Sequence, residues 1–365
     1  MRTTQRVRRA ALATVAAIVI GGSGVAIGAS ATGSTASGST ASATPGPAVA
    51  GSSAGTASYA GVVRQVLPSV VLIRTPDGLG SGVVLDRSGN IVTNAHVAGS
   101  ATKFGVQVAG DTAPRTARLV GTYPPDDLAV IRADDPSGLQ PATFGDSDRA
   151  QAGDVVLAIG NPLGLSGSVT EGIISATDRA ITEPAAPGAA GQSRAAATLP
   201  GAIQTSAPIN PGNSGGALVS TSGQVIGIPT LAAASPQGGA QAQGIGFAIP
   251  SNLARDIATQ IIDSGHVTNS HRAALGAEVA TVLSADGASA QGVGVVTITG
   301  AGPADRAGLR AGDVIRSVGS ASTPDATALS AALAGARPGD KVSLTISRGA
   351  QDQTVQVTLG ELPGG

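Results

Sequence analysis

The chain has 365 residues, a length that allows two or three folded units and a sizeable buried core. Charged residues make up 12% of the chain and the formal net charge is -1, so its charge suggests neither a nucleic acid nor another polyanion as a partner. The absence of cysteine excludes disulfides and thiolate metal sites, and we expect no metal and no organic cofactor.

The N-terminus combines a basic start with an uncharged apolar run. Residues 1–9 carry four arginines and are predicted to be a cytoplasmic tail, because a positive flank stays on that side of the membrane. Residues 10–29 are long enough for a transmembrane anchor, and a cleaved signal peptide is the alternative. Residues 30–57 are almost all Ala, Gly, Ser, Thr and Pro, which predicts a disordered linker. We therefore expect a single-pass protein of the cell membrane with its folded part extracytoplasmic, or a secreted protein.

The rest of the chain alternates short apolar runs with Gly, Pro, Asp and Ser, a pattern typical of β-structure. Two segments without periodicity, 182–200 and 232–243, are predicted to be loops. A closing helix is predicted over 251–262, with Ser251 and Asn252 as candidate caps. The clearest predicted strands are 70–73, 83–85, 155–159, 172–174 and 225–228.

Three short segments supply an imidazole, a carboxylate and a glycine-flanked serine in the chain order His, Asp, Ser. A serine hydroxyl is a weak nucleophile and needs an adjacent base, and His96 is predicted to be that base. Asp127 is predicted to hold the imidazole ring. We prefer it to Asp126 because successive side chains of a strand point to opposite faces. The predicted nucleophile is Ser214, in the segment Asn210-Pro211-Gly212-Asn213-Ser214-Gly215-Gly216.

Backbone N–H groups around the serine are the predicted oxyanion hole. Gly212 can adopt a positive φ that turns its N–H and that of Ser214 toward one point, where a developing oxyanion would be stabilised. Asn213 lies between these two residues and is included in the predicted hole. Loss of one such donor typically lowers a rate by about 100- to 1000-fold.

Each of these pieces also has an ordinary structural explanation. A histidine in a strand is more often structural than a base, a glycine-rich run is more often a plain turn, and an Asp-Asp pair is usually solvated. The combination outweighs these alternatives. The other two histidines, His266 and His271, lie in a polar segment. Only His96 follows a hairpin-like pattern, formed by residues 82–85 and 91–93.

Several motifs together carry a family resemblance. They are Gly80 to Val84, Thr93 to Val97, Asp127 to Val130, Ala158 to Gly164, Gln204-Thr205, Asn210 to Leu218 and Gly244 to Pro250. The chain resembles the HtrA/Deg family of serine proteases from about Tyr59 onward. The resemblance implies a mainly β fold: a chymotrypsin-like double β-barrel protease domain over 58–262, a linker over 263–272 and a small α+β PDZ domain over 273–362.

The resemblance also implies roles for individual residues. His96, Asp127 and Ser214 would form the catalytic triad. Arg179 is similar in position to an arginine that couples regulatory signals to the active site, its alternative being an ordinary solvated charge. Family members are commonly trimers, so a homotrimer is one candidate assembly.

A second set of residues is predicted to bind peptides. Leu275, Gly276 and Ala277 resemble the carboxylate-binding loop of a PDZ domain, where backbone N–H groups would hold the C-terminus of a peptide that adds as a strand. The alternative is a small α+β domain whose groove is merely packing.

Specificity follows partly from the implied fold, in which the residue six before the nucleophile lies at the base of the primary pocket. That residue is Pro208, with Ile226, Gly227 and Ile228 on the strand predicted to line one wall. No acid is placed to pair a basic side chain, so we expect cleavage after small or medium apolar residues. Because such residues are buried in folded proteins, the expected substrates are unfolded or damaged proteins.

Two functions from different classes are compatible with these patterns. The first is an exported serine endoprotease that is regulated by C-terminal peptides at its PDZ domain. The second is a non-catalytic or dual-function chaperone or adaptor that binds unfolded clients. The complete set of catalytic residue types favours the first.

Overall fold

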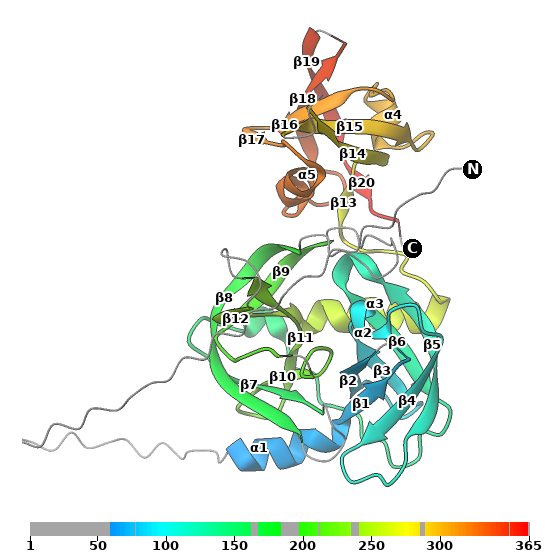
Figure 1. The fold of residues 1–365 in the computed structure, drawn as a ribbon, viewed down its shortest axis with the longest axis vertical. Coiled ribbons are helices and arrows are strands. Elements are labelled where there is room, and N and C mark those ends of the chain that lie inside the picture. The colour runs from blue at the N-terminus through cyan, green and yellow to red at the C-terminus, as the bar shows by residue number, and fades with distance from the viewer. Residues whose placement is uncertain are drawn as a thin grey trace, which may run out of the picture. The chain divides into compact units, whose positions relative to one another are not determined.

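The computed structural model describes residues 59–76, 78–161, 167–183, 197–210, 212–234, 241–284, 289–349 and 351–363 (Figure 1). The predictions made for the cytoplasmic tail, the anchor or signal peptide and the linker that follows it fall on residues 1–57, outside these ranges. Among the described residues, no helix has the length and apolar character needed to cross a membrane.

The first part of the fold is a closed antiparallel barrel with the strand order β1-β2-β3-β6-β5-β4 (Figure 1). Its strands are β1 (Val70–Arg74), β2 (Leu79–Val84), β3 (Asn90–Thr93), β4 (Lys103–Val108), β5 (Arg115–Tyr123) and β6 (Leu128–Ala133). The predicted hairpin is present, with Val83 opposite Val92. Two short elements interrupt the barrel: helix α2 (Ala95–Ala98) after β3, and the 3-10 helix η2 (Pro124–Asp126) before β6.

A second closed barrel follows, with the order β10-β11-β12-β9-β8-β7. Its strands are β7 (Val155–Gly160), β8 (Ser168–Glu183), β9 (Ala197–Thr205), β10 (Ala217–Ser220), β11 (Val225–Ala234) and β12 (Gln241–Pro250). The predicted loops 182–200 and 232–243 are too long, because Thr182 pairs with Thr198 and Ala232 with Gly246. Ladder hydrogen bonds between backbones need no apolar periodicity, so the pattern did not indicate these strand ends.

The two barrels share one apolar core with two helices. This core joins side chains of the first barrel, such as Val83 and Val130, to side chains of the second, such as Leu157 and Ile228. The flanking elements are α1 (Tyr59–Val66), the 3-10 helices η1 (Leu67–Ser69) and η3 (Ser147–Arg149), and α3 (Ser251–Ser264). Burial of aliphatic side chains is the main stabilising contribution here, at about 25 cal/mol per Å² of apolar surface.

Helix α3 begins as predicted, but its cap differs from the prediction. The cap residue is Pro250, which makes no side-chain cap hydrogen bond. Ser251 is instead the first helical residue, fully buried, and its hydroxyl donates to the Gly145 carbonyl at 2.8 Å. Asn252 donates its side-chain amide to Asp146 at 2.7 Å. Both polar side chains therefore bind the neighbouring segment rather than the helix start.

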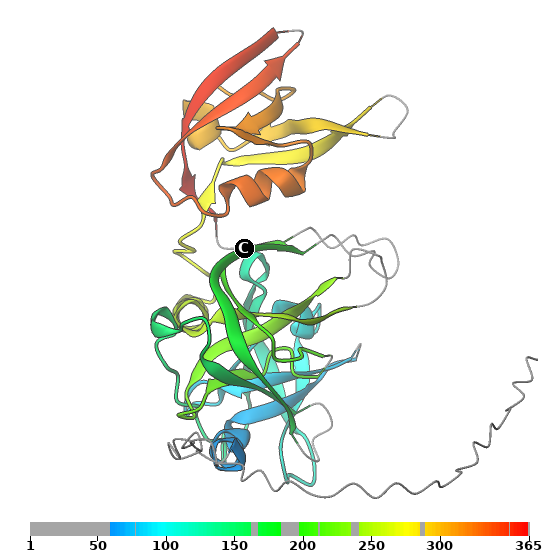
Figure 2. The same cartoon turned by 90° about the vertical axis from the view of Figure 1, so that its left-hand side faces the viewer.

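The C-terminal domain has a five-strand sheet path β14-β15-β16-β18-β19, with β17 paired to β16 and a separate pair β13-β20. Figure 2 shows helix α5 beside the strands of this sheet. The strands are β13 (Ala273–Ala274), β14 (Ala277–Leu283), β15 (Ala290–Ile298), β16 (Val314–Val318), β17 (Ala321–Ser322), β18 (Lys341–Arg348), β19 (Gln351–Thr358) and β20 (Gly360–Glu361), and the helices are α4 (Pro303–Arg306) and α5 (Ala326–Leu333). Its core is aliphatic and separate from that of the barrels.

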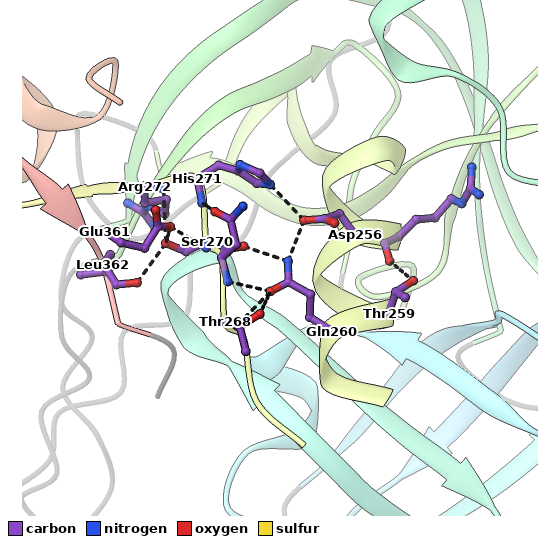
Figure 3. A network of polar contacts seen from close by, with 11 residues as sticks. Asp256, Thr259, Gln260, Thr268, Ser270, His271, Arg272, Glu361 and Leu362 are labelled. Atoms are coloured by element: carbon purple, nitrogen blue, oxygen red, sulfur yellow. Dashed lines mark hydrogen bonds and ion pairs between the residues drawn. The ribbon is translucent and has the colours of Figure 1, made fainter. Parts of the chain in front are cut away.

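Polar side chains hold the linker that follows α3 (Figure 3). The Gln260 side chain accepts the Thr268 N–H at 2.9 Å and donates to the Asn269 carbonyl at 2.8 Å. Ser270 donates through its hydroxyl to Glu361 of β20 at 2.6 Å. The linker is thus tied by named hydrogen bonds to α3 at its start and to β20 at its end.

Helix α5 has a side-chain cap whose removal should be measurable. The Asp325 carboxylate accepts the Ala328 N–H at 2.8 Å. We expect Asp325→Ala to lower the unfolding free energy of the C-terminal domain by about 1 kcal/mol, because one N–H of the first turn loses its acceptor. Urea unfolding of the two proteins measures this, with Asp325→Asn, which keeps an acceptor, as the control. An equal loss in both variants would contradict the capping role.

Candidate active site

His96 and Asp127 are joined by two hydrogen bonds. His96 lies in α2, directly after β3, and its Nδ1 is 2.8 Å from Asp127 Oδ2. The backbone N–H of His96 donates to the other carboxylate oxygen at 2.9 Å. Asp127 is 1% exposed, whereas the His96 side chain is 24% exposed. The buried carboxylate therefore holds an imidazole whose other edge can reach solvent or a ligand.

The backbone around Asp127 explains why this carboxylate faces the histidine. Asp127 has a φ of 52° and follows η2, and its carbonyl accepts hydrogen bonds from Ala95 N at 3.0 Å and Asn94 Nδ2 at 3.2 Å. Asp127 rather than Asp126 faces His96, but the strand argument for that choice is wrong. Neither residue is in a strand; the left-handed turn at Asp127 separates the two side chains.

Thr230 of β11 contacts both halves of the site. Its hydroxyl donates to Asp127 Oδ2, and its carbonyl accepts from Ser214 Oγ at 3.3 Å. Thr230 is 2% exposed. No hydrogen bond between Ser214 and His96 occurs among the described residues, a situation that is common in sites without substrate. Thr230 was not predicted to belong to the site. The only sequence feature that could have indicated it is its position two residues beyond the predicted strand 225–228.

The turn that carries Ser214 is fixed by its own polar groups. Asn213 donates its backbone N–H to the Asn210 carbonyl at 3.1 Å, and its side chain accepts the Asn210 N–H at 3.0 Å. Gly212 has a φ of 118° and Gly215 a φ of 79°, values that strongly favour glycine. Because the Asn213 N–H is engaged within the turn, Gly212 and Ser214 are left as the predicted oxyanion donors.

Asp126 forms a buried ion pair next to this site. Its side chain is fully buried, and Oδ1 lies 3.0 Å from Nη1 of Arg272, which also donates to the Pro125 carbonyl at 2.6 Å. Its second oxygen has no hydrogen-bond partner among the described residues. Burial raises the pKa of the Asp126 carboxyl to about 6, although the Arg272 guanidinium opposes this shift.

The residues predicted for the primary pocket do not share one environment. Pro208 is exposed, and its carbonyl accepts from Asn213 Nδ2 at 3.1 Å. Ile226, at 7% exposure, packs into the core of the second barrel, and Ile228 is fully buried in the core shared by both barrels. Gly227 lies between them in β11. The two isoleucine side chains therefore contribute first of all to packing.

The remaining predicted residues belong to β8 and to the C-terminal domain. Arg179 is exposed and lies in β8, opposite Ala202. In the C-terminal domain, Leu275 is buried in the core, Gly276 has a φ of 69° and Ala277 begins β14. Among the described residues, no three His, Asp or Glu side chains gather in a way that could hold a metal ion.

Known families match the two parts of the fold. The model of the trypsin-like peptidase domain matches residues 80–228, and the model of the PDZ domain matches residues 267–359. The serine endoprotease DegS of Salmonella typhimurium is 36% identical over 325 residues, which cover 84% of this chain and 87% of DegS. This chain belongs to the HtrA family of serine proteases. The predicted fold is confirmed: a chymotrypsin-like pair of six-stranded barrels, followed by a PDZ domain.

Other HtrA-family proteins are similarly related. The serine protease PepD of Mycobacterium tuberculosis is 39% identical over 319 residues, and the periplasmic pH-dependent serine endoprotease DegQ of Escherichia coli is 38% identical over 291 residues. The chain spans only 65% of PepD and 59% of DegQ, although these matches cover 82% and 78% of this chain. The solved structure of the HtrA-type protease AlgW with a tripeptide has 38% identity and a TM-score of 0.54, covering 84% of this chain and 98% of that one.

Proposed function

We propose that this HtrA-family chain is a serine endopeptidase with His96, Asp127 and Ser214 as its triad. The observation that carries the proposal is the shared contact of Thr230, which binds the carboxylate that holds His96 and also accepts a hydrogen bond from Ser214. A carboxylate, an imidazole and a serine hydroxyl in one cluster are the groups that acyl transfer requires.

In the proposed mechanism, the Ser214 hydroxyl turns from the Thr230 carbonyl toward His96 Nε2. His96 removes the hydroxyl proton as Ser214 Oγ attacks the scissile carbonyl carbon, and it later gives that proton to the leaving amine. Asp127 keeps the proton of the neutral ring on Nδ1 and stabilises the imidazolium. The N–H groups of Gly212 and Ser214 stabilise the oxyanion. Water then hydrolyses the acyl-enzyme by the same route.

The proposed substrates are unfolded or damaged proteins, cleaved after small or medium apolar residues. Pro208 at the implied base of the pocket, with Ile226 and Ile228 on the strand implied to line one wall, offers no carboxylate to a basic side chain. Apolar side chains are exposed mainly when a protein is unfolded. Ready cleavage after arginine in a peptide library would contradict this specificity.

The proposed setting is extracytoplasmic. The basic start and apolar run of residues 1–29 support export, and related proteins such as DegQ are named as periplasmic. Peptides with a free C-terminus are the proposed ligands of Leu275, Gly276 and Ala277, supported by the match to a PDZ domain. Retention of the anchor, a homotrimer and a regulatory role for Arg179 belong to the same proposal.

Cleavage of an unfolded, disulfide-free protein by purified residues 58–365 tests the proposal. Ser214→Ala, prepared in the same way, controls for contaminating proteases, and a fluorophosphonate probe should label only the protein that retains Ser214. We expect fragments whose ends give the residue preference, and faster cleavage when peptides ending in apolar residues are added. Absence of both cleavage and labelling, with aggregation of the client still suppressed, would favour the chaperone function instead.

A further inference from the structure

We propose that Ser81 is a positioning residue for the oxyanion hole, an inference that rests on the serine endopeptidase activity proposed above. Ser81 lies in β2 of the first barrel and is fully buried. Its hydroxyl donates to the Gly212 carbonyl at 2.5 Å, a contact between residues 131 positions apart in the chain. The first barrel thereby binds the turn of the second barrel that carries the nucleophile.

Ser81 binds this turn at two points. Besides the hydroxyl contact to Gly212, its backbone N–H donates to the Ser214 carbonyl at 3.1 Å. The peptide between Gly212 and Asn213 is therefore held at both ends, since the Asn213 N–H donates to the Asn210 carbonyl. A peptide unit is planar, so fixing its C=O and its N–H fixes the whole plane. The two predicted oxyanion donors, Gly212 N and Ser214 N, flank this plane.

A fixed plane matters because the turn is built around glycine. Gly212 has a φ of 118°, and a residue without Cβ can exchange this conformation for many others. A rotation of the Gly212–Asn213 peptide would change where the neighbouring N–H groups point. The Ser81 hydroxyl favours one orientation by giving the Gly212 carbonyl a buried donor. Preorganised donors stabilise an oxyanion more than donors that must first reorient.

The direction of the Ser81 hydroxyl is set by a third partner. The backbone N–H of Asn161, the residue after β7, donates to Ser81 Oγ at 2.8 Å. Because an N–H can only donate, the hydroxyl proton is left for the Gly212 carbonyl. Gly160, the residue before Asn161, also packs closely against this turn, because a Cβ on it would lie only 2.4 Å from the Gly212 oxygen. Ser81 therefore joins three segments: β2, the end of β7 and the nucleophile turn.

The test compares two buried serines whose hydroxyls donate to backbone carbonyls in different parts of the fold. Ser251 is also fully buried and donates to a backbone carbonyl, but in α3, at Gly145. Ser81→Ala and Ser251→Ala each remove one such hydroxyl. We measure kcat and KM on a fluorogenic peptide taken from a mapped cleavage site, inhibition by a peptide boronate whose tetrahedral adduct mimics the oxyanion, and the urea midpoint.

We expect Ser81→Ala to lower kcat by about 10- to 100-fold, to change KM by less than about threefold and to weaken boronate binding in parallel with kcat. Ser251→Ala should keep kcat and boronate binding within about twofold of the unmodified protein. It should lower the urea midpoint about as much as Ser81→Ala does. Ser81→Cys, which keeps a weak donor, should retain more kcat than Ser81→Ala and carries the test if the alanine variant does not fold.

Two results would overturn the inference in distinguishable ways. If the unmodified protein is active and Ser81→Ala keeps the kcat and boronate affinity of Ser251→Ala, the hydroxyl of Ser81 is only structural and the proposed function stands. If the unmodified protein neither hydrolyses the peptide nor reacts with a fluorophosphonate at Ser214, the proposed function fails and the role of Ser81 fails with it.

Discussion

Asp127→Asn is expected to lower kcat by about 10⁴-fold while leaving the fold intact, as replacement of the triad carboxylate by its amide does in trypsin-like sites. The carboxylate uses both oxygens: Oδ1 accepts the His96 backbone N–H at 2.9 Å, and Oδ2 lies 2.8 Å from His96 Nδ1. An asparagine has only one acceptor oxygen for these two positions.

The backbone donor decides how the asparagine amide would be oriented. The N–H of His96 cannot turn away, so the amide oxygen takes the Oδ1 position and the NH₂ group faces His96 Nδ1. The imidazole must then accept at Nδ1 and carry its proton on Nε2, where it can no longer take the proton of Ser214. The Thr230 hydroxyl, which donates to Oδ2, can rotate and does not prevent this.

Steady-state kinetics on the fluorogenic peptide measures the effect, and the neighbouring residue gives a matched control. Asp126→Asn removes a charge one position away, but Asp126 binds Arg272 rather than the imidazole. We expect its kcat within a few-fold of the unmodified protein. Equal losses in the two variants would mean that charge near the turn, rather than the orientation of His96, is what the site requires.

The barrels were predictable because their cores are aliphatic runs between turn residues. Val70 to Ile73 and Val155 to Ile159 lie in strands β1 and β7, as the apolar runs predicted. The ends of β8, β9, β11 and β12 were not predictable, since residues such as Thr182 and Ala232 belong to strands through pairing with residues far away in the chain. Pairing between distant strands leaves no pattern within a single strand.

Short motifs identified the residues that we propose carry the chemistry, but not the residues that contact and orient them. His96, Asp127 and Ser214 stand in recognisable segments, and the structure brings the first two into direct contact. Thr230 and Ser81 both act through hydrogen bonds that join the two barrels, Thr230 to Asp127 and Ser81 to the Gly212 carbonyl. Thr230 lies in none of the quoted motifs, and Ser81 lies in the motif Gly80 to Val84, which by itself does not say what its hydroxyl binds. Three-dimensional contacts were needed to find them.

Asp126 makes the second large prediction, a dependence of stability on pH. The pKa of its buried carboxyl is raised from 3.8 to about 6, chiefly by burial. A group whose pKa is higher in the folded protein favours folding while protonated, so its contribution is fully present below about pH 4 and is lost as the pH rises through about 6. A shift of about two pKa units corresponds to about 3 kcal/mol of unfolding free energy.

The groups that face Asp126 act in both directions. The Arg272 guanidinium, 3.0 Å away, and the more distant charge of His271 lower the pKa of Asp126, but burial outweighs them. The nearby phenol of Tyr123 is itself buried, and burial raises its pKa, so it adds no charge near neutral pH. The ionised carboxylate therefore stays costly even with its arginine partner, as expected for a buried pair with one unsatisfied oxygen.

Replacing Asp126 by asparagine removes the titration and isolates its contribution. Urea unfolding of Ser214→Ala and of Ser214→Ala/Asp126→Asn avoids self-digestion, and the difference between their unfolding free energies is followed from pH 4 to pH 7. We expect the double variant to gain stability relative to its parent by about 2 to 3 kcal/mol over this range and no more above it. Asp135→Asn in the same Ser214→Ala background is the control. Hydrogen-bond donors at Ser137 lower the pKa of exposed Asp135, so this carboxyl is ionised above pH 5 in both the folded and the unfolded protein. The difference in unfolding free energy between this variant and its parent should therefore not change above pH 5. A flat curve for Asp126→Asn as well would show that the pKa of Asp126 is not raised in the folded protein, because Arg272 stabilises the carboxylate at least as strongly as burial disfavours it.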